Sequence, residues 1–167
     1  TRVPVQRAGI YVQDFLEISR QFKVLAGLRW SYLENKTSEV SVYNGFDATK
    51  APKVAPSQTD RAFSPKAGLV YTPTENMTVY GTYTNSFVPN SGLDINREPL
   101  KPSVVDQFEI GLKQNLFNNS VALNLNAYQI TNNNTYQTSL TDSTLKEFAG
   151  KVRSRGVELD IQGNPTA

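Results

Sequence analysis

The chain has 167 residues, with 17 Lys and Arg against 15 Asp and Glu, and a formal net charge of +2. It contains neither cysteine nor histidine, which excludes disulfides, zinc–thiolate sites and Ser-His-Asp triads. A nearly balanced charge without a basic run gives no support for nucleic-acid binding. No run of eighteen apolar residues is present, which excludes a spanning helix but leaves a spanning barrel open, because barrel strands alternate polar and apolar side chains.

Two strands are predicted in the first part of the chain, over residues 7–17 and 22–34. In the second, alternate positions form an apolar row of Phe22, Val24, Ala26, Leu28, Trp30 and Tyr32. Because side chains alternate between the two faces of a strand, this row predicts one apolar and one polar face. The first strand alternates less cleanly and its face assignment stays open, since Ile10, Val12 and Leu16 fall opposite Tyr11 and Phe15.

Residues 63–87 predict a β-hairpin with a compact polar turn at 72–76. One face of the first arm carries Phe63, Pro65, Ala67, Leu69 and Tyr71. The corresponding face of the second arm carries Met77, Val79, Gly81, Tyr83 and Phe87. Hydroxyl and charged side chains dominate the opposite faces, so the hairpin repeats the two-faced pattern of the preceding strand.

The rest of the chain predicts three further strands, over residues 104–115, 120–131 and 151–162. Within the second of these the apolar side shifts at Tyr128 and Ile130, which predicts a bulge there. Polar segments without sustained periodicity predict three long loops, at residues 35–61, 88–101 and 132–147. Inside the first loop, residues 40–43 can extend the preceding strand pair beyond the main sheet.

Short and long connections alternate along this chain. Short turns therefore meet at one edge of the predicted sheet and long loops at the other, which is typical of outer-membrane barrels. The predicted strands reach ten residues or more, whereas globular strands usually have about five or six. From Phe22 to Tyr32 the strand would rise roughly 23 Å at a tilt of about 45°, close to the apolar band of about 25 Å between the aromatic girdles of such barrels. The predicted fold is an all-β antiparallel meander of seven long strands.

Four stretches, taken together and in this order, resemble the later part of the barrel of TonB-dependent outer-membrane siderophore receptors. They are AGIYVQDF at 8–15, VLAGLRW at 24–30, FSPKAGLVYTPTENMTVYGTYTNSFVPNSG at 63–92 and KVRSRGVELDIQG at 151–163. The resemblance spans nearly the whole chain. It implies that residues 1–167 are part of a transmembrane β-barrel of twenty-two strands with a plug inside. Seven strands cannot close such a barrel, so the plug, the first strands and the last strand are expected outside these residues.

The resemblance also implies a function and a set of partners. Receptors of this family take up ferric siderophores across the bacterial outer membrane with energy delivered by the TonB complex, so we expect a receptor and not an enzyme. A ferric siderophore is the expected transported ligand, and no built-in cofactor, catalytic residue or metal site is expected. The expected partners are outer-membrane lipid, the plug domain of the same full-length chain and, through the missing N-terminal part, the TonB complex.

Charged and amide side chains recur on the face opposite the apolar rows, namely Lys23, Arg29, Lys66, Gln107, Glu109, Lys113, Glu158 and Asp160. Water or a plug can satisfy such groups in the lumen of a barrel. We interpret them mainly as structural charges, each of which is solvated or paired, and substrate contact is the less favoured interpretation for any one of them.

Ligand contacts are expected near the loop end of the strands. Aromatic and cationic side chains there offer stacking and cation contacts to a bulky iron chelate. The candidates are Tyr32, Tyr43, Phe46, Phe87, Arg97, Tyr136 and Phe148. Taken singly, each is more readily explained as an ordinary loop anchor.

Two other classes of protein remain as alternatives at this level. A soluble β-sandwich that serves as a binding or adhesion module would cover the apolar face with a second sheet. An outer-membrane barrel enzyme is less favoured, because a hydrolase without histidine would need an unusual dyad and the lumen-facing carboxylates show no paired spacing.

Overall fold

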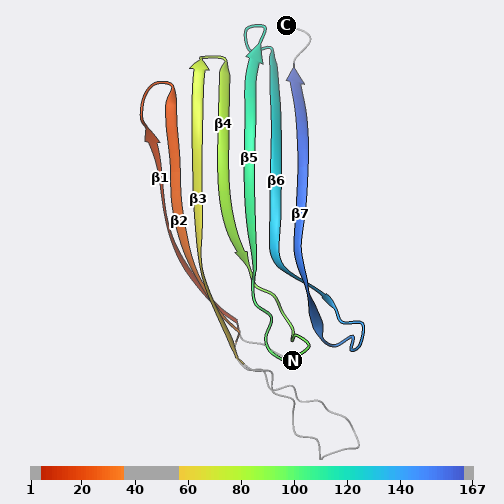
Figure 1. Ribbon diagram of the computed structural model, residues 1–167. Coiled ribbons are helices and arrows are strands. Elements are labelled where there is room, and N and C mark those ends of the chain that lie inside the picture. Colours follow the sequence, from red (N-terminus) through yellow and green to blue (C-terminus); the bar gives the residue numbers. More distant parts are fainter. Residues whose placement is uncertain (1–4, 36–56, 164–167) are drawn as a thin grey trace, which may run out of the picture.

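The computed structural model describes residues 5–35 and 57–163, which form a single antiparallel sheet (Figure 1). Every strand pairs with its neighbours in chain order. The strands are β1 (Val5–Glu17), β2 (Phe22–Asn35), β3 (Gln58–Thr74), β4 (Met77–Val88), β5 (Ser103–Leu116), β6 (Val121–Thr138) and β7 (Lys146–Gly163). The predicted all-β meander of seven long strands is confirmed. Within the described part of the chain, no helix has the length and hydrophobicity needed to span a membrane.

Tight turns and long connections lie at opposite ends of the sheet, as predicted. The turns that join β1 to β2, β3 to β4 and β5 to β6 lie at the top of Figure 1. The connections at the other end include residues 89–102 and 139–145. The predicted strand extension at residues 40–43 lies outside the described residues. We call the two ends of the sheet the turn end and the loop end.

Two details of the last strands correct the sequence-based expectations. The predicted loop at residues 132–147 is mostly strand, because β6 continues to Thr138 and β7 already begins at Lys146. The pairing survives a register shift between Asn132 and Thr135 and continues through Tyr136 opposite Phe148. The bulge predicted at Tyr128 and Ile130 is wrong, since the register is regular from Val121 to Asn132.

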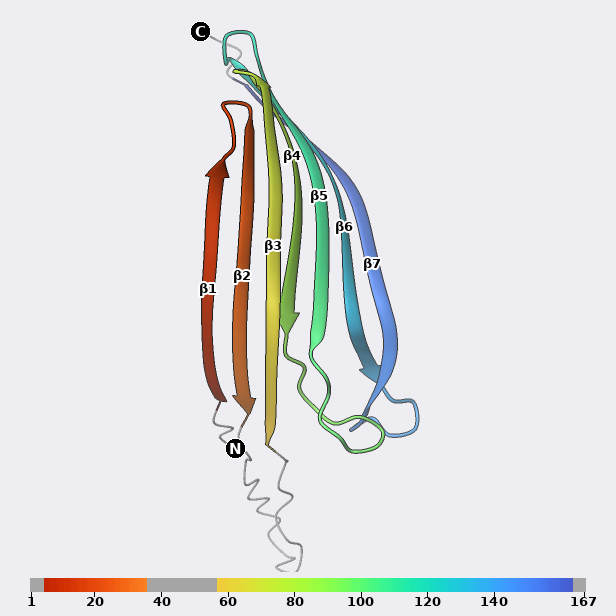
Figure 2. The same cartoon turned by 60° about the vertical axis from the view of Figure 1, so that its left-hand side comes forward.

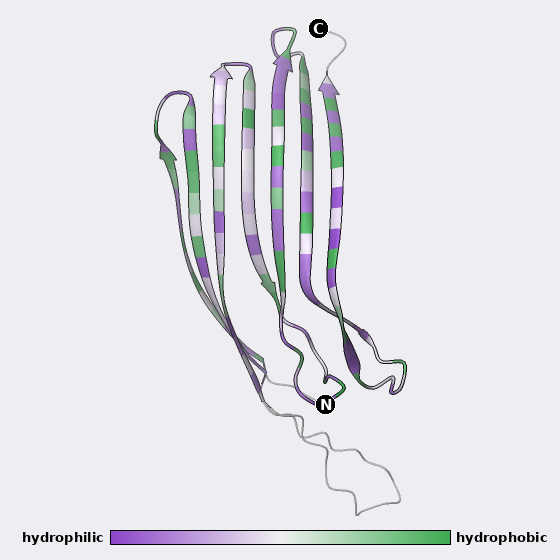
Figure 3. Ribbon diagram, viewed as in Figure 1, coloured by the Kyte–Doolittle hydropathy of each residue, from purple (hydrophilic) through white to green (hydrophobic). Residues whose placement is uncertain are grey.

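The strand register separates an apolar face from a polar face. Residues directly opposite each other in antiparallel strands lie on the same face. The row that includes Phe22 continues across the sheet through Tyr71, Val79, Leu112, Leu125 and Leu159, and this row defines the apolar face. All eight predicted lumen-facing residues lie on the other side, which we call the polar face. Figure 3 shows the alternation along the strands.

The same register decides the orientation of β1, which the sequence leaves open. Ile10 lies opposite Trp30 and Val12 lies opposite Leu28, so both belong to the apolar face. Tyr11 therefore points to the polar face. The pairing of β1 with the apolar row of β2 decides which face each β1 side chain occupies. The sequence of β1 does not, because it places large apolar side chains on both faces of the strand.

No second layer covers the apolar face in the described part of the chain. The only buried apolar side chains there are Leu33 and Leu100, both at the loop end, whereas Ile110 is 61% exposed and Val157 is 71% exposed. Figure 2 shows the sheet as one curved layer. A sandwich would bury one whole face of each sheet, so the described residues do not favour the soluble β-sandwich alternative.

The positions of the tight turns show that the strands are tilted. Phe22, Tyr71 and Leu112 occupy one row, and β2 begins in it. From this row β3 runs on to Thr74 and β5 runs on to Leu116. From each strand to the next, the turn end therefore shifts by about one residue along the strand direction. This shift is roughly 3.3 Å, compared with a distance of about 4.8 Å between neighbouring strands. This corresponds to a tilt of roughly 35°, at the lower end of the range of about 35–45° for barrels.

The tilt refines the predicted height of the apolar face. At roughly 35°, the stretch from Phe22 to Tyr32 rises roughly 27 Å, still close to the apolar band of about 25 Å in membrane barrels. Aromatic side chains mark both limits of this band. At the turn end Phe22 stacks on Tyr71 with 4.5 Å between the ring centroids, and toward the loop end Trp30 lies 6.2 Å from Tyr32.

Candidate functional site

The connection between β4 and β5 folds into a compact platform at the loop end of the sheet. Its Leu100 side chain is 3% exposed, and the Leu100 carbonyl accepts a hydrogen bond of 2.7 Å from the Gln58 side-chain amide on β3. Asn90 donates to the Lys101 carbonyl and to the Ser103 hydroxyl at 2.8 and 3.0 Å. Residues 89–102 are therefore held against the sheet on both sides.

The platform is also bonded to the last two strands. The Lys146 amide donates to the Leu93 carbonyl at 2.9 Å, and the Ser103 hydroxyl donates to the Asn134 carbonyl at 2.9 Å. In return the Asn134 side chain donates to the Pro102 carbonyl at 3.1 Å. Because three elements share these bonds, the loop is positioned by the rigid sheet, as recognition loops usually are.

The outermost turn of the platform exposes Arg97. One Asp94 carboxylate oxygen accepts hydrogen bonds of 2.8 Å from the amides of Asn96 and Glu98, and the Arg97 amide donates to the Asp94 carbonyl at 2.9 Å. These bonds hold Arg97 at φ 65°, in the left-handed region that few non-glycine residues adopt. The turn therefore presents a cation at the edge of the platform.

Two of the predicted ligand-binding aromatics meet beside this platform. The rings of Tyr136 on β6 and Phe148 on β7 lie edge to face, 6.0 Å apart. The Tyr136 hydroxyl accepts a hydrogen bond of 3.3 Å from the Lys101 amide, which links the aromatic pair to the loop. Arg97, Tyr136 and Phe148 therefore belong to one structural unit at the loop end.

The other predicted site residues are distributed differently. Tyr32 and Phe87 both line a shallow hollow at the loop end, together with Arg29, Ser31 and Pro89. The Tyr32 ring also carries the Arg61 guanidinium 5.7 Å from its centroid. Tyr43 and Phe46 lie outside the described residues. The ligand-binding role of all seven residues stays a prediction.

Sequence reasoning missed a polar cluster on the apolar face of β4, β5 and β6. The Asp106 carboxylate accepts hydrogen bonds of 2.8 Å from the Tyr83 hydroxyl, 2.8 Å from Asn85 and 3.0 Å from Asn133. The only signal in the sequence is that the apolar alternation stops at Phe108 on β5. The register, and not the sequence spacing, brings these side chains together.

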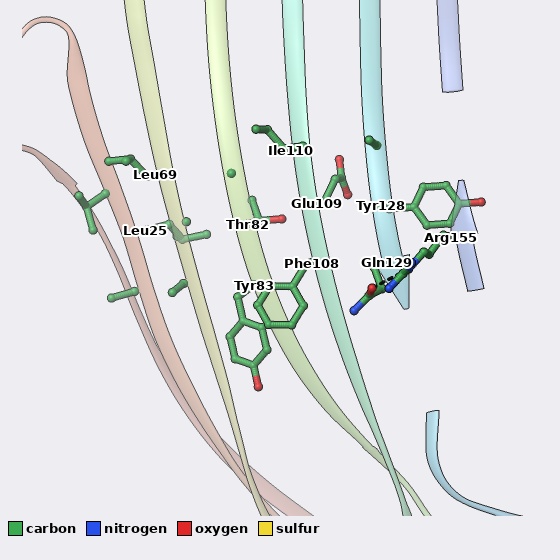
Figure 4. A pocket seen from close by; sticks show the side chains of 16 residues that line it. Leu25, Leu69, Thr82, Tyr83, Phe108, Glu109, Ile110, Tyr128, Gln129 and Arg155 are labelled. Carbon is green, nitrogen blue, oxygen red and sulfur yellow. Dashed lines mark hydrogen bonds between the residues drawn. The ribbon is translucent and has the colours of Figure 1, made fainter. Parts of the chain in front are cut away.

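On the turn-end side of this cluster the apolar face is hollowed across six strands, β2 to β7 (Figure 4). Small residues such as Ala67 and Gly81 form its floor, and Tyr83 and Phe108 lie side by side at its loop-end rim, 4.8 Å between centroids. At the β7 side the Arg155 guanidinium donates to the Gln129 side-chain carbonyl at 2.8 Å. The hollow is shallow and almost entirely apolar, which suits hydrocarbon chains.

On the polar face, two tyrosines lie over glycines of the neighbouring strand. Tyr80 on β4 covers Gly111 on β5, and its hydroxyl donates to the Glu109 carboxylate at 2.8 Å. Tyr128 on β6 covers Gly156 on β7 in the same way. Among the residues described, no group of three or more His, Cys, Asp or Glu side chains is arranged to hold a metal ion.

Comparison with known proteins identifies the family. The family model of the TonB dependent receptor-like β-barrel matches residues 1–166. The chain belongs to this family. The metal-pseudopaline receptor CntO of Pseudomonas aeruginosa is 25% identical over 97% of the chain and 22% of that receptor. An uncharacterized TonB-dependent receptor of Haemophilus influenzae is 31% identical over 95% of the chain and 44% of that protein.

Solved structures agree with this assignment. The ferric-catecholate import receptor Fiu of Escherichia coli K12 superposes with a TM-score of 0.72 and 25% identity, over 97% of the chain and 26% of the receptor. The chain thus spans between about a fifth and a half of the length of the receptors it resembles. It is a segment of the wall of an outer-membrane β-barrel, and its family consists of receptors. Its apolar face accordingly faces lipid, and its loop end, by the rule for such barrels, faces the cell exterior.

Proposed function

We propose that the full-length receptor takes up ferric siderophores with energy delivered by the TonB complex, and that this segment supplies part of its extracellular recognition surface. Two similar proteins, the metal-pseudopaline receptor CntO and the ferric-catecholate import receptor Fiu, support a chelated metal as the cargo. The plug and the TonB-contacting segment of the full-length chain belong to this proposal as well.

The observation that carries the proposal is the platform at the loop end. Its Arg97 and the Tyr136–Phe148 pair stand on one hydrogen-bonded unit that faces the exterior. A ferric siderophore is large and offers few polar groups to a single pocket. Aromatic rings supply broad stacking area at low entropic cost, and a cation adds attraction to an anionic chelate. Several loops are therefore expected to share recognition, namely the loop predicted at residues 35–61 and the connections at residues 89–102 and 139–145.

The test uses the full-length receptor and a panel of ferric hydroxamate, catecholate and carboxylate chelates. We expect the double variant Tyr136→Ala/Phe148→Ala to bind its chelate at least about tenfold more weakly, because two stacked aromatics each contribute about 1 kcal/mol. Phe117→Ala is the matched control, since Phe117 is an aromatic side chain 76% exposed at the turn end, on the periplasmic side.

Transport is measured separately as uptake of radioactive iron by cells with and without a functional TonB complex. Uptake that continues without TonB would overturn the energy-coupling part of the proposal. If the double variant and Phe117→Ala bind every chelate with the affinity of the native receptor, the platform does not take part in recognition. Recognition would then be sought in the plug.

A further inference from the structure

Two cations occupy neighbouring positions on the polar face of β2 and β3. Lys66 on β3 lies opposite Gly27 on β2, and Arg29 is the next β2 residue on that face. Diagonal neighbours in a sheet lie about 7–8 Å apart, so one ligand of the size of a siderophore can contact both side chains. Both strands are paired on either side, β2 with β1 and β3, and β3 with β2 and β4. The two cations therefore belong to the interior of the described sheet, and not to one of its edges.

The two cations line a shallow hollow whose other polar-face side chains can form hydrogen bonds. Tyr11 lies opposite Arg29, and Thr84 lies opposite Lys66. None of the described residues that line this hollow carries a negative charge. We call it the cationic hollow and define it by its six polar-face side chains, which are Tyr11, Gln13, Arg29, Ser64, Lys66 and Thr84.

Arg29 connects the cationic hollow to the platform. Its side chain leans toward the loop end, where its Nε donates to the Ser31 hydroxyl at 3.1 Å. A second hollow, which Arg29 also lines, begins there and reaches Pro89 of the platform. The platform covers this side of the sheet, since the buried sheet residues toward the loop end all lie on the polar face, namely Leu33, Asp60, Ser64 and Ser103. The cationic hollow is therefore the next surface inward from the platform.

Charge is divided unevenly over the polar face. Arg29 and Lys66 lie on β2 and β3, whereas β5 and β7 carry the carboxylates of Glu109, Glu158 and Asp160. The remaining lysines of this face lie nearer the turn end, where Lys23 is paired with Glu17 and Lys113 lies over the Tyr80 ring. Charges of one sign that line a cleft attract ligands of the opposite sign. An anion that passes the platform is therefore drawn toward β2 and β3 and away from β5 and β7.

We propose that the cationic hollow is a second binding site for the chelate, on the lumen side, and that it receives an anionic chelate from the platform. The Arg29 guanidinium suits a carboxylate or catecholate, which it can contact with two parallel hydrogen bonds, and Lys66 adds a point charge. Tyr11, Gln13 and Thr84 offer further hydrogen-bond donors. The inference rests on the proposed function for its ligand. It adds that this ligand carries a net negative charge and enters the lumen along β2 and β3.

The experiment measures equilibrium binding and TonB-dependent uptake separately, with the full-length receptor and the ferric chelate of the panel that it binds best. The test variant is Arg29→Gln/Lys66→Gln. We expect its affinity for the chelate to stay within about twofold of the native value, because the platform is intact and distant. Uptake at saturating chelate is expected to fall at least about tenfold, because charge-assisted hydrogen bonds to the anion are lost. The charge-retaining variant Arg29→Lys/Lys66→Arg is expected to keep most of the uptake.

The matched control is Lys23→Gln/Lys113→Gln, which removes the same charge from the same face nearer the turn end and is expected to keep native uptake. Heat-modifiable migration on gels verifies that each variant is folded.

Native uptake by the folded test variant would overturn the inference and leave the proposed function intact, as would a chelate without net negative charge. A native receptor that binds no chelate would contradict both. If the test variant also admits a large hydrophilic antibiotic, the plug has been displaced. The inference would then be overturned, and the two cations would be assigned to carboxylates of the plug.

Discussion

Tyr80 covers Gly111, so adding a single Cβ atom at Gly111 is predicted to lower the stability of the receptor. A Cβ added at Gly111 would lie 2.5 Å from the Tyr80 hydroxyl oxygen and even closer to two ring carbons. Ordinary carbon contacts need about 3.5 Å, so Gly111→Ala must push the Tyr80 ring away. The ring then loses its packing on the β5 backbone and its hydrogen bond to Glu109.

Three contributions determine the expected change in the free energy of unfolding. One destabilises the receptor, and the other two reduce that loss. Loss of a hydrogen bond to a charged group costs about 1.5–3 kcal/mol when the group stays unsatisfied. Glu109 is half-buried on a face that water can reach, so part of this cost is recovered by hydration. Replacing glycine by alanine also stabilises a compatible strand position by about 0.4–1 kcal/mol through the unfolded chain. We expect a net destabilisation of about 1–2 kcal/mol for Gly111→Ala.

The assay is urea titration of the full-length receptor folded into liposomes. Gly81→Ala is the matched control in the neighbouring strand, because a Cβ at Gly81 would meet only the Glu109 carbonyl oxygen, at 3.9 Å. That control is expected to be neutral or slightly stabilising. In a Tyr80→Ala background, Gly111→Ala should cost nothing. An equal loss of stability with and without the Tyr80 ring would refute the reasoning.

Two further predictions concern the lipid-facing side of the sheet and the behaviour of the isolated segment. Leu69→Arg in the full-length receptor should impair insertion, since a cation near the middle of the lipid face costs about 2–4 kcal/mol, whereas Lys66→Leu on the polar face should be milder. Folding into liposomes followed by urea titration compares them, and equal costs would contradict the assignment of the apolar face to lipid. The isolated segment 1–167 should aggregate or require detergent, because β1 and β7 expose unpaired edges and the apolar face is a large open patch. A monodisperse, detergent-free monomer with dispersed amide signals would contradict this.

The sequence by itself determined the strands, their two faces and the asymmetry of the connections. An alternation such as Phe22, Val24, Ala26 needs no partner to show which side chains share a face, because the period of a strand is two. The eight polar-face residues were predicted for the same reason. The turn and loop ends follow from Gly, Pro, Asn and Ser clusters, whose backbone preferences are local.

Tertiary structure alone decided every feature that depends on register. The bulge predicted at Tyr128 fails because Tyr128 is on the polar face over Gly156, a glycine 28 positions later in the chain whose fit no local pattern shows. The length of β6 and β7 beyond residue 131 depends on their pairing across the shift at Asn132. The hydrogen bonds around Asp106 come from strands β4 and β6.

The heights of residues in the membrane also required the structure. Sequence places Trp30 and Tyr32 at the end of one apolar row, but only the stagger of the turns sets the height of that row relative to the rows of the other strands. Stagger is a relation between neighbouring strands, fixed by their backbone hydrogen bonds and the twist of the sheet. Side-chain periodicity therefore specifies the faces of this barrel wall, whereas interstrand geometry specifies what lies side by side on them.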